Sequence, residues 1–460
     1  MTREALRRRP PTALDPSSWW QGLAALTRSG RAGEGLSWAL YDFANTIFSY
    51  GVVSYAIGLW SVDRLGESGG QVALAVATAV SVGLNALVSP VLGAMSDRTG
   101  RRLPYLLFFT VLTIACTAAI GLVSLDDGLP LLAFLGLGLF TIANFAYQAA
   151  LIYYDATLPE VATARGLGRM SGIGVAVGYL GTIVVAVLIL LLDAGSSPLT
   201  FFMVAALFAL FSLPIFLRVR EPQRAGSPFR LVDAARSWSQ VATTLRHGRE
   251  IPGLLRFLVG RFFYTDPVNT AIVIMAVFST EAIGLSKAGA NLMLLLLTVV
   301  AVIASFLWGR AVSAWGPKRT LLAVLGSWCV GLVIIASTLS LPTFVIGGIL
   351  LGSGLGGVWT SDRVYLLRLA PPAQVGEFFG LYGLVGKLSA VIGPLLYSSL
   401  VASLLGPLGK GAYQVAILSL LVLMLIGLGI IRGVPEGHPP EETQAPAPQP
   451  AIVPPGEVPA

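Results

Sequence analysis

Charged side chains are scarce in this chain. Only 12% of its 460 residues are Asp, Glu, Lys or Arg, whereas 55% are hydrophobic. A soluble domain carries roughly a quarter charged residues, because its surface faces water. The composition therefore excludes an ordinary soluble protein, and we expect most of the surface to face a lipid bilayer.

Cysteine and histidine are also rare. Cys116 and Cys329 fall inside apolar runs, so no disulfide framework is expected, and His247 and His438 fall in predicted loops. The sequence contains no cluster of metal ligands, no nucleophile motif and no phosphate-binding loop. It therefore predicts neither an enzyme nor a bound metal or cofactor. The net charge of +7 is interpreted as membrane topology and not as nucleic-acid binding.

Long apolar runs are what the sequence does contain. Each is close to the ~20 residues that a helix needs to cross a bilayer, and the runs are continuous, which disfavours strands. The predicted fold is an all-α polytopic membrane protein with twelve transmembrane helices in two pseudo-symmetric six-helix bundles. The predicted spans are residues 36–60, 71–95, 104–124, 129–154, 170–193, 198–217, 253–280, 288–312, 320–338, 342–369, 377–401 and 411–432.

Five segments follow from this pattern. They are a leader (1–35), a first six-helix bundle (36–217), a central loop (218–252), a second bundle (253–432) and a tail rich in Pro, Glu, Gln and Ala that we expect to be disordered (433–460). Basic residues concentrate in alternate loops, which places both termini in the cytoplasm. The expected location is the bacterial inner (plasma) membrane. The central loop repeats apolar residues at helical spacing, as in a helix at the membrane surface or a solvated linker helix. These residues are Leu231, Ala235, Trp238, Ala242 and Leu245.

Two motifs occur once in each predicted bundle. The pattern D-x-x-N-T spans Asp42–Thr46 in the first span and Asp266–Thr270 in the seventh. The loop after the second span, Gly93–Arg102, is echoed after the eighth by Gly309–Arg319. Two repeats in the same order indicate a duplicated six-helix unit, which is the architecture of major facilitator transporters.

The first of these loops has the pattern G-x-x-x-D-R-x-G-R-R. Gly100 permits a tight reversal, and Asp97 is placed to accept hydrogen bonds from backbone donors at a neighbouring helix end. The alternative is a simple basic turn on the cytoplasmic side. The loop resembles the signature between helices two and three of the major facilitator superfamily. The candidate gating residues in it are Gly93, Asp97, Arg98, Gly100 and Arg101.

That resemblance implies that Asp97 and Arg98 hold the two bundles together and help to govern alternating access. The second copy departs from the signature, because Ser313 stands in place of the aspartate and Pro317 in place of an arginine. The resemblance therefore does not extend to the second copy the role of holding the two bundles together.

Longer stretches resemble the vacuolar-effluxer-like branch of the superfamily. They are WALYDFANTIF, IYYDATLPEV, SGIGVAVGYLGT, RFFYTDPVNT and EFFGLYGLVGKLSAVIGP, and the resemblance covers about residues 34–432. It implies a monomeric secondary transporter of a small polar solute, with amino-acid efflux as the family-derived hypothesis and protons or sodium as coupling ions. Two alternatives stay open: a transport-inactive sensor or scaffold, and a lipid translocator.

Ionisable residues inside the spans mark pathways, pairs or coupling sites, because an unpaired charge in a bilayer is costly. Spans one, four and seven carry polar faces at helical spacing, and the resemblance implies that helices one, four, seven and ten line a central cavity. The candidate substrate and coupling residues are Asp42, Asn45, Asn144, Gln148, Arg261, Asp266, Asn269 and Lys387.

Four ionisable residues in the spans also have simpler interpretations. Asp42 could serve an interfacial or structural role. Asp362 and Arg363, near the inner end of span ten, are predicted to form a gating ion pair. Lys387 is the strongest candidate for function, and the alternative is a buried Lys–Asp pair that only fixes packing.

Overall fold

The computed structural model describes residues 32–126, 130–222 and 251–438, and no strand occurs in these ranges. The predicted surface helix of the central loop lies outside the described residues, as do most of the leader and the tail from residue 439 onward. The first tail residues are described, and they pack on the C-terminal bundle: Val434 is buried, and the Tyr365 hydroxyl donates to the carbonyl oxygen of Pro435 at 2.6 Å.

The N-terminal bundle, called the N-half below, begins with one continuous helical run and continues with six further helices. The run consists of α2 (Ala32–Phe48), the π-helical segment η1 (Ser49–Ala56) and α3 (Ile57–Leu65). The other helices are α4 (Glu67–Thr99), α5 (Leu103–Val123), α6 (Pro130–Ala156), the short α7 (Leu158–Val161), α8 (Leu167–Leu191) and α9 (Pro198–Arg218).

The C-terminal bundle, called the C-half, repeats this plan with one break. Its elements are α11 (Leu254–Val277) with η2 (Phe278–Ala282), α12 (Lys287–Trp315), α13 (Pro317–Ser337), α14 (Leu341–Leu369), η3 (Pro372–Gln374), α15 (Val375–Ser389), α16 (Ile392–Leu408) and α17 (Gly411–Arg432). The break between α15 and α16 interrupts the predicted eleventh span. Pro394 explains it, because a proline ring clashes with the carbonyl four residues earlier, at Ala390.

The predicted twelve-span architecture is confirmed. Eleven helical runs in the described residues are long and apolar enough to cross a membrane, and α2–α3 is the remaining span. That first run is less apolar because its polar face includes Asp42, Asn45 and Ser49. Large apolar side chains cover the outside of the bundle, and Phe108, for example, is 62% exposed. An apolar exterior of this extent suits lipid and not water.

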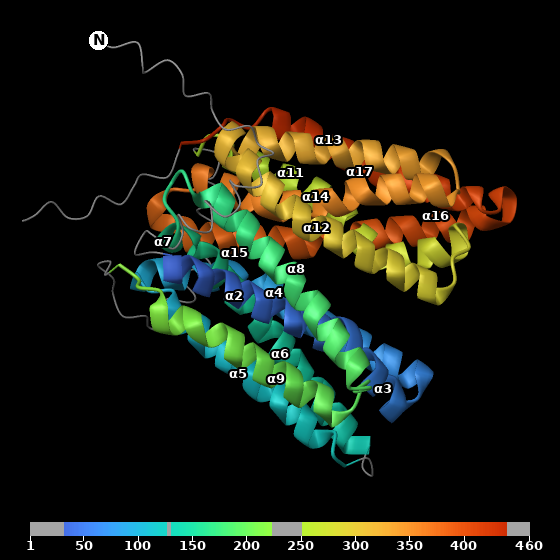
Figure 1. Ribbon diagram of the computed structural model, residues 1–460, viewed down its shortest axis with the longest axis horizontal. Coiled ribbons are helices and arrows are strands. Elements are labelled where there is room, and N and C mark those ends of the chain that lie inside the picture. The colour runs from blue at the N-terminus through green and yellow to red at the C-terminus, as the bar shows by residue number, and fades with distance from the viewer. Residues whose placement is uncertain (1–31, 127–129, 223–250, 439–460) are drawn as a thin grey trace, which may run out of the picture.

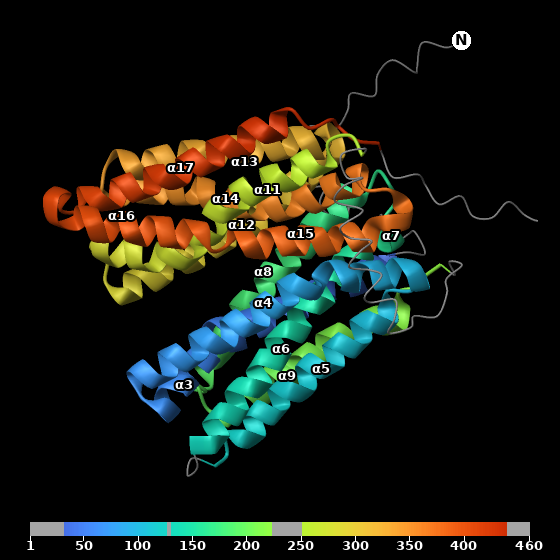
Figure 2. The same ribbon diagram turned by 180° about the vertical axis from the view of Figure 1, so that it is seen from behind.

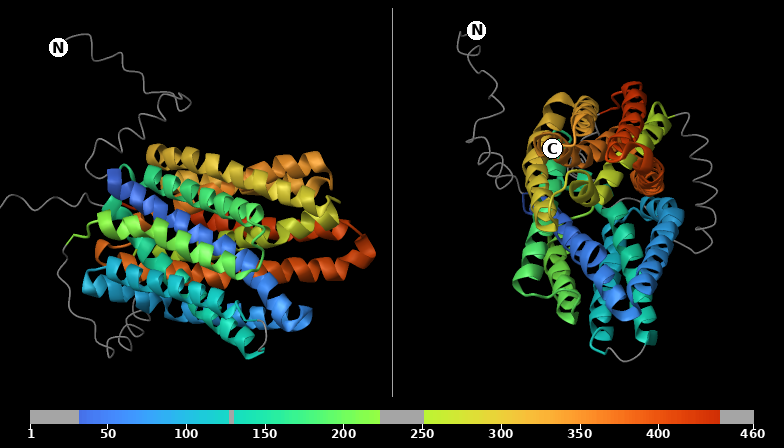
Figure 3. Two further views of the ribbon diagram at one scale, coloured as in Figure 1. Left: turned by 60° about the horizontal axis from the view of Figure 1, so that its bottom comes forward. Right: turned by 90° about the vertical axis from the view of Figure 1, so that its right-hand side faces the viewer.

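The two halves meet at one end and separate at the other. Figures 1 and 2 show α2–α9 and α11–α17 as two groups of helices that converge near α7 and diverge toward α3 and α16. The further views in Figure 3 show the same two groups. Helix α4 packs on α15 and α8 packs on α12, and these are the principal contacts between the halves. The end where they converge is called the joined end below.

Candidate functional site

The first contact at the joined end connects the end of α4 to the start of α15. Asp97 accepts hydrogen bonds from the backbone N–H groups of Gly376 and Glu377, both at 2.8 Å. A carboxylate at a helix N-terminus is stabilised by the helix dipole and by the unpaired N–H groups there. The predicted contact of Asp97 with a neighbouring helix end is therefore observed. We call this contact the first junction.

Two glycines shape the first junction. Gly93 packs so closely on α15 that a Cβ there would collide with the carbonyl group of Gly376. Gly100 ends α4 with φ 67°, in the left-handed region that glycine adopts without strain, as the predicted reversal requires. The sequence pattern thus places the carboxylate and allows the close approach of the two helices.

The buried arginine of the first junction is Arg102, whereas Arg98 and Arg101 are exposed. Arg102 lies 3.7 Å from the Asp97 carboxylate and 3.2 Å from that of Glu160. Arg98, which the resemblance places beside Asp97 in holding the bundles together, is exposed, and its role stays a prediction. The doubled arginine at the loop's end was a usable signal, because the second arginine directly precedes α5 and its side chain lies against α6.

The second loop copy forms a related contact, the second junction, between α12 and α8. The Ser313 hydroxyl accepts a hydrogen bond of 3.2 Å from the backbone N–H of Arg169, in the first turn of α8. A Cβ on Gly309 would lie 2.9 Å from the Gly168 carbonyl oxygen. The close helix approach is thus present on both sides of the molecule, but the charged acceptor is present only in the first junction.

An ion pair connects the halves deeper in the bundle. Arg363 on α14 lies 3.1 Å from the Asp155 carboxylate on α6. Its guanidinium also donates to the hydroxyl and the carbonyl oxygen of Ser171 on α8, at 2.6 and 2.8 Å. The Trp38 ring covers it, with the guanidinium carbon 5.1 Å from the ring centroid. One C-half side chain therefore holds two N-half helices.

The neighbouring Asp362 pairs within the C-half. It forms an ion pair with Arg261 of α11 and accepts a hydrogen bond of 2.8 Å from the Tyr382 hydroxyl of α15. The predicted pairing of Asp362 with Arg363 is wrong. Consecutive residues on a helix project about 100° apart, so each of these two side chains finds its partner on a different helix.

Asp42 lies about three turns from the start of α2 and is not fully buried. Its carboxylate faces Gly178 of α8, where a Cβ would lie 3.2 Å from the Asp42 Cγ. No ion pair of Asp42 occurs within the described residues. One turn further along, both polar atoms of the Asn45 amide are buried without a hydrogen-bond partner.

The two candidate substrate residues on α6 have different surroundings. Asn144 is buried and donates to the Ser81 hydroxyl of α4 at 2.7 Å, which is a packing contact inside the N-half. Gln148, one turn on, is partly exposed. The expected substrate contact thus gains no support at Asn144.

Lys387, near the end of α15, donates a hydrogen bond to the amide oxygen of Asn85 on α4. In the part of the chain that the structure describes, no carboxylate pairs with Lys387, so the predicted alternative of a Lys–Asp pair is not found. Successive contacts along α15 run from Gly376 at Asp97 through Gly380 at Ser89 to Lys387. The lysine therefore lies where the helices of the two halves begin to separate.

Asp266 and Asn269 face the break in the eleventh span. Asp266 is 2% exposed, and its Oδ1 accepts a hydrogen bond of 2.8 Å from the backbone N–H of Gly393, in the first turn of α16. The Asn269 amide lies 3.4 Å from the Gly386 carbonyl oxygen of α15. These residues connect α11 to both segments of the broken helix.

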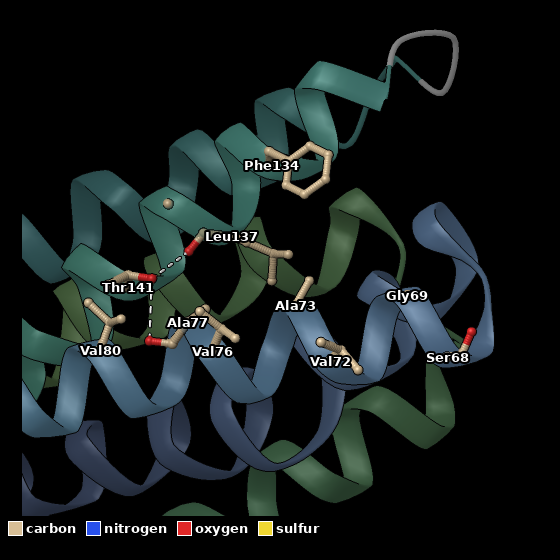
Figure 4. A pocket seen from close by; sticks show the side chains of 11 residues that line it. Ser68, Gly69, Val72, Ala73, Val76, Ala77, Val80, Phe134, Leu137 and Thr141 are labelled. Atoms are coloured by element: carbon tan, nitrogen blue, oxygen red, sulfur yellow. Dashed lines mark hydrogen bonds between the residues drawn. The ribbon is translucent and has the colours of Figure 1, made fainter.

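An apolar groove of about 720 Å³ lies between α4 and α6, toward the separated end. In Figure 4, Val72, Val76 and Val80 of α4 lie opposite Phe134 and Leu137 of α6. The groove has no charged lining residue, so we do not assign it to a polar solute.

The chain matches a known protein family and is similar to several known proteins. The family model "Vacuole effluxer Atg22 like" matches residues 72–442. The chain is 28% identical over 420 residues to the uncharacterized MFS-type transporter YxiO of Bacillus subtilis, covering 87% of this chain and 94% of that one. It is 22% identical to autophagy-related protein 22-1 of Neosartorya fischeri, over 50% of this chain and 42% of that protein.

Solved structures share the fold. The human organic anion transporter MFSD10 matches with a TM-score of 0.64 and 20% identity, covering 87% of this chain and 98% of that one. The major facilitator transporter FucP in its outward conformation matches with a TM-score of 0.66 and 14% identity, covering 88% and 99%.

Proposed function

Because the chain belongs to the Atg22-like vacuole effluxer family of major facilitator transporters, we propose that it moves a small zwitterionic solute of the amino-acid type by alternating access. It is an integral multi-pass membrane protein and a transporter, not an enzyme. The proposal adds the chemical class of the solute and the residues that bind it.

The observation that carries the proposal is the distribution of paired and unpaired charges. Arg261 and Arg363 are each neutralised by a carboxylate. Within the described spans, Asp42 and Lys387 have no ion-pair partner and are not fully buried. An unpaired charge inside a membrane protein is costly, so it is retained where a ligand or ion compensates it. A zwitterion compensates both, with its ammonium at Asp42 and its carboxylate at Lys387.

The arrangement of the halves supports alternating access. We propose that the protein lies in the plasma membrane with both termini in the cytoplasm, as the concentration of basic residues in alternate loops favours. The joined end is then the cytoplasmic end, and the described conformation is outward-open. Opening toward the cytoplasm requires the two junctions and the Asp155–Arg363 pair to separate, so all three act as an inner gate.

The proposal is tested with purified protein in proteoliposomes, by uptake of radiolabelled amino acids and of analogues that lack either the amine or the carboxylate. We expect Asp42→Asn and Lys387→Gln each to reduce transport about tenfold or more, because each removes a charged hydrogen-bonding partner of the solute. Lys410→Gln, which removes a lysine outside the spans, is the matched control and should leave uptake unchanged.

Other outcomes separate the alternatives. Equal transport by wild type, Asp42→Asn and Lys387→Gln would remove the assignment of these residues. Binding without flux would favour a sensor or scaffold. Movement of fluorescent lipids between leaflets without solute flux would favour a lipid translocator.

A further inference from the structure

We propose that Asn85 is a positioning residue: its amide oxygen holds Lys387 before the solute binds, and the carboxylate of the solute then replaces it. This exchange removes a contact between α4 and α15 and so couples solute binding to the inner gate. The inference rests on the proposed function. It adds a residue of the second span, which the polar faces of spans one, four and seven do not include.

Asn85 is fixed within the N-half. It is fully buried, and its amide nitrogen donates a hydrogen bond of 3.0 Å to the carbonyl oxygen of Phe145 on α6. One turn earlier on α4, Ser81 accepts the hydrogen bond from Asn144 of the same helix α6. Because the amide nitrogen of Asn85 is engaged by α6, the amide oxygen is the group that faces α15, where it accepts from Lys387. The N-half thus presents a fixed acceptor to the C-half.

Lys387 reaches this acceptor by turning back toward the joined end. Its ammonium lies beside Gly383, one turn earlier on α15, where a Cβ would lie 3.6 Å from Nζ. Side chains on a helix lean toward its N-terminus, and α15 begins at the joined end. A lysine has a flexible four-carbon stem, so the ammonium can leave Asn85 for a ligand while the backbone of α15 stays in place.

The acceptor is neutral, which distinguishes this contact from the other buried cations of the bundle. Arg261 and Arg363 each pair with a carboxylate. The Asn85 amide oxygen accepts from an ammonium with three donors and leaves its charge uncompensated. A solute carboxylate brings a full negative charge and two oxygens, and such charged hydrogen bonds are stronger than those to a neutral amide. The solute therefore displaces the amide, whereas an aspartate at position 85 would keep the lysine.

The place of the contact connects it to the gate. Asn85 precedes Asp97 on α4 by about three turns, or roughly 18 Å along the helix axis. Between them, Ser89 packs on α15 so closely that a Cβ on Gly380 would collide with its carbonyl oxygen. The contacts of α4 with α15 therefore run from the first junction to the level where the halves separate. Loss of the Lys387 contact shortens this row of contacts from the end at which the solute binds.

The first experiment uses purified protein without solute, with spin labels at the ends of α4 and α15. Asn85→Leu removes the acceptor at similar volume, so the population with a separated joined end should rise about tenfold, because a hydrogen bond to a charged group is lost. Asn85→Asp replaces that bond with an ion pair, so the same population should fall below the wild-type level. Wild-type distance distributions in both variants would overturn the proposal, as would opening by both.

Two further variants serve as controls. Asn291→Asp makes the same chemical change at an exposed position of α12 and should match wild type. Asn85→Ala takes the place of Asn85→Leu if that variant does not fold, since it removes the acceptor by truncation alone. Its expected shift has the same direction.

The second experiment adds solute. The probe is an equimolar mixture of alanine, leucine and serine, compared with ethylamine, isopentylamine and ethanolamine, which lack the carboxylate. We expect the amino acids, but not the amines, to separate the joined end of wild type and to have little further effect on Asn85→Leu. Binding of the mixture should be several-fold tighter in Asn85→Leu, where no amide is displaced, and lost in Asn85→Asp.

The affinity separates positioning from packing. A residue that only packs would not raise the affinity when it is replaced, so equal binding by wild type and Asn85→Leu would contradict the exchange. If the mixture neither binds to wild type nor moves its joined end, the proposed zwitterionic solute fails. The solute-free comparison of Asn85→Leu with Asn85→Asp then still decides whether Asn85 holds Lys387 at the gate.

Discussion

The two junctions at the joined end have similar packing and different chemistry. In both, a glycine near the end of a helix lies against a glycine of the other half, and a side chain four residues later accepts from a backbone N–H in the first turn of the facing helix. The first junction uses the Asp97 carboxylate and two N–H donors, whereas the second uses the Ser313 hydroxyl and one. Close packing thus sets the approach of the helices, and charge sets how firmly each side is held.

The largest effect is expected from removing the charge. Asp97→Ala leaves two N–H groups of α15 without their acceptor, and hydrogen bonds to a charged group contribute about 1.5–3 kcal/mol each. The closed arrangement of the joined end should therefore lose about 3 kcal/mol or more, which is about 100-fold in the gating equilibrium. Cysteine accessibility at the start of α15 measures it, and a change below threefold would contradict the assigned contact.

A smaller effect is expected at the second junction. Ser313→Ala removes one neutral hydrogen bond, worth about 1 kcal/mol, so the equilibrium should shift by about fivefold. The readout is accessibility of a cysteine at the start of α8, with Ser327→Ala on the neighbouring helix α13 as control. If this variant opened the joined end as far as Asp97→Ala does, the two junctions would be equivalent.

The smallest effect is expected from making the junctions alike. Ser313→Asp places a carboxylate at the N-terminus of α8, where the helix dipole contributes about 0.3–1 kcal/mol. The closed arrangement should gain about two- to fivefold, and solute exchange should slow in proportion. Faster exchange would show that a charge at this position is not held by α8.

The first junction could be predicted because its signals are local. The spacing of Gly93, Asp97 and Gly100 specifies a close approach, an acceptor and a reversal, and the observed contacts follow that order. The twelve spans could be predicted for the same reason, because each span is recognised from the hydropathy of its own residues. The break in the eleventh span was signalled by Gly393 and Pro394, whereas the hydrogen bond from Gly393 to Asp266 of another helix was not.

Partners across the bundle could not be predicted, because they depend on how helices are rotated against each other. Asp362 and Arg363 are adjacent in sequence yet pair with α11 and α6. Arg102, at the start of α5, and Glu160, on α7, meet only in the folded molecule. Asn144 has the spacing of a cavity residue, but its amide bonds to Ser81 inside the N-half.

The central claim, that the joined end is held by charge at one junction and by packing with one neutral hydrogen bond at the other, is tested by one distance measurement. Spin labels at the ends of α4 and α15 report the separation of the halves in wild type, Asp97→Ala and Ser313→Ala. The account predicts a short distance in wild type, a largely long distance in Asp97→Ala and a mostly short distance in Ser313→Ala. Equal distributions in the two variants would contradict it.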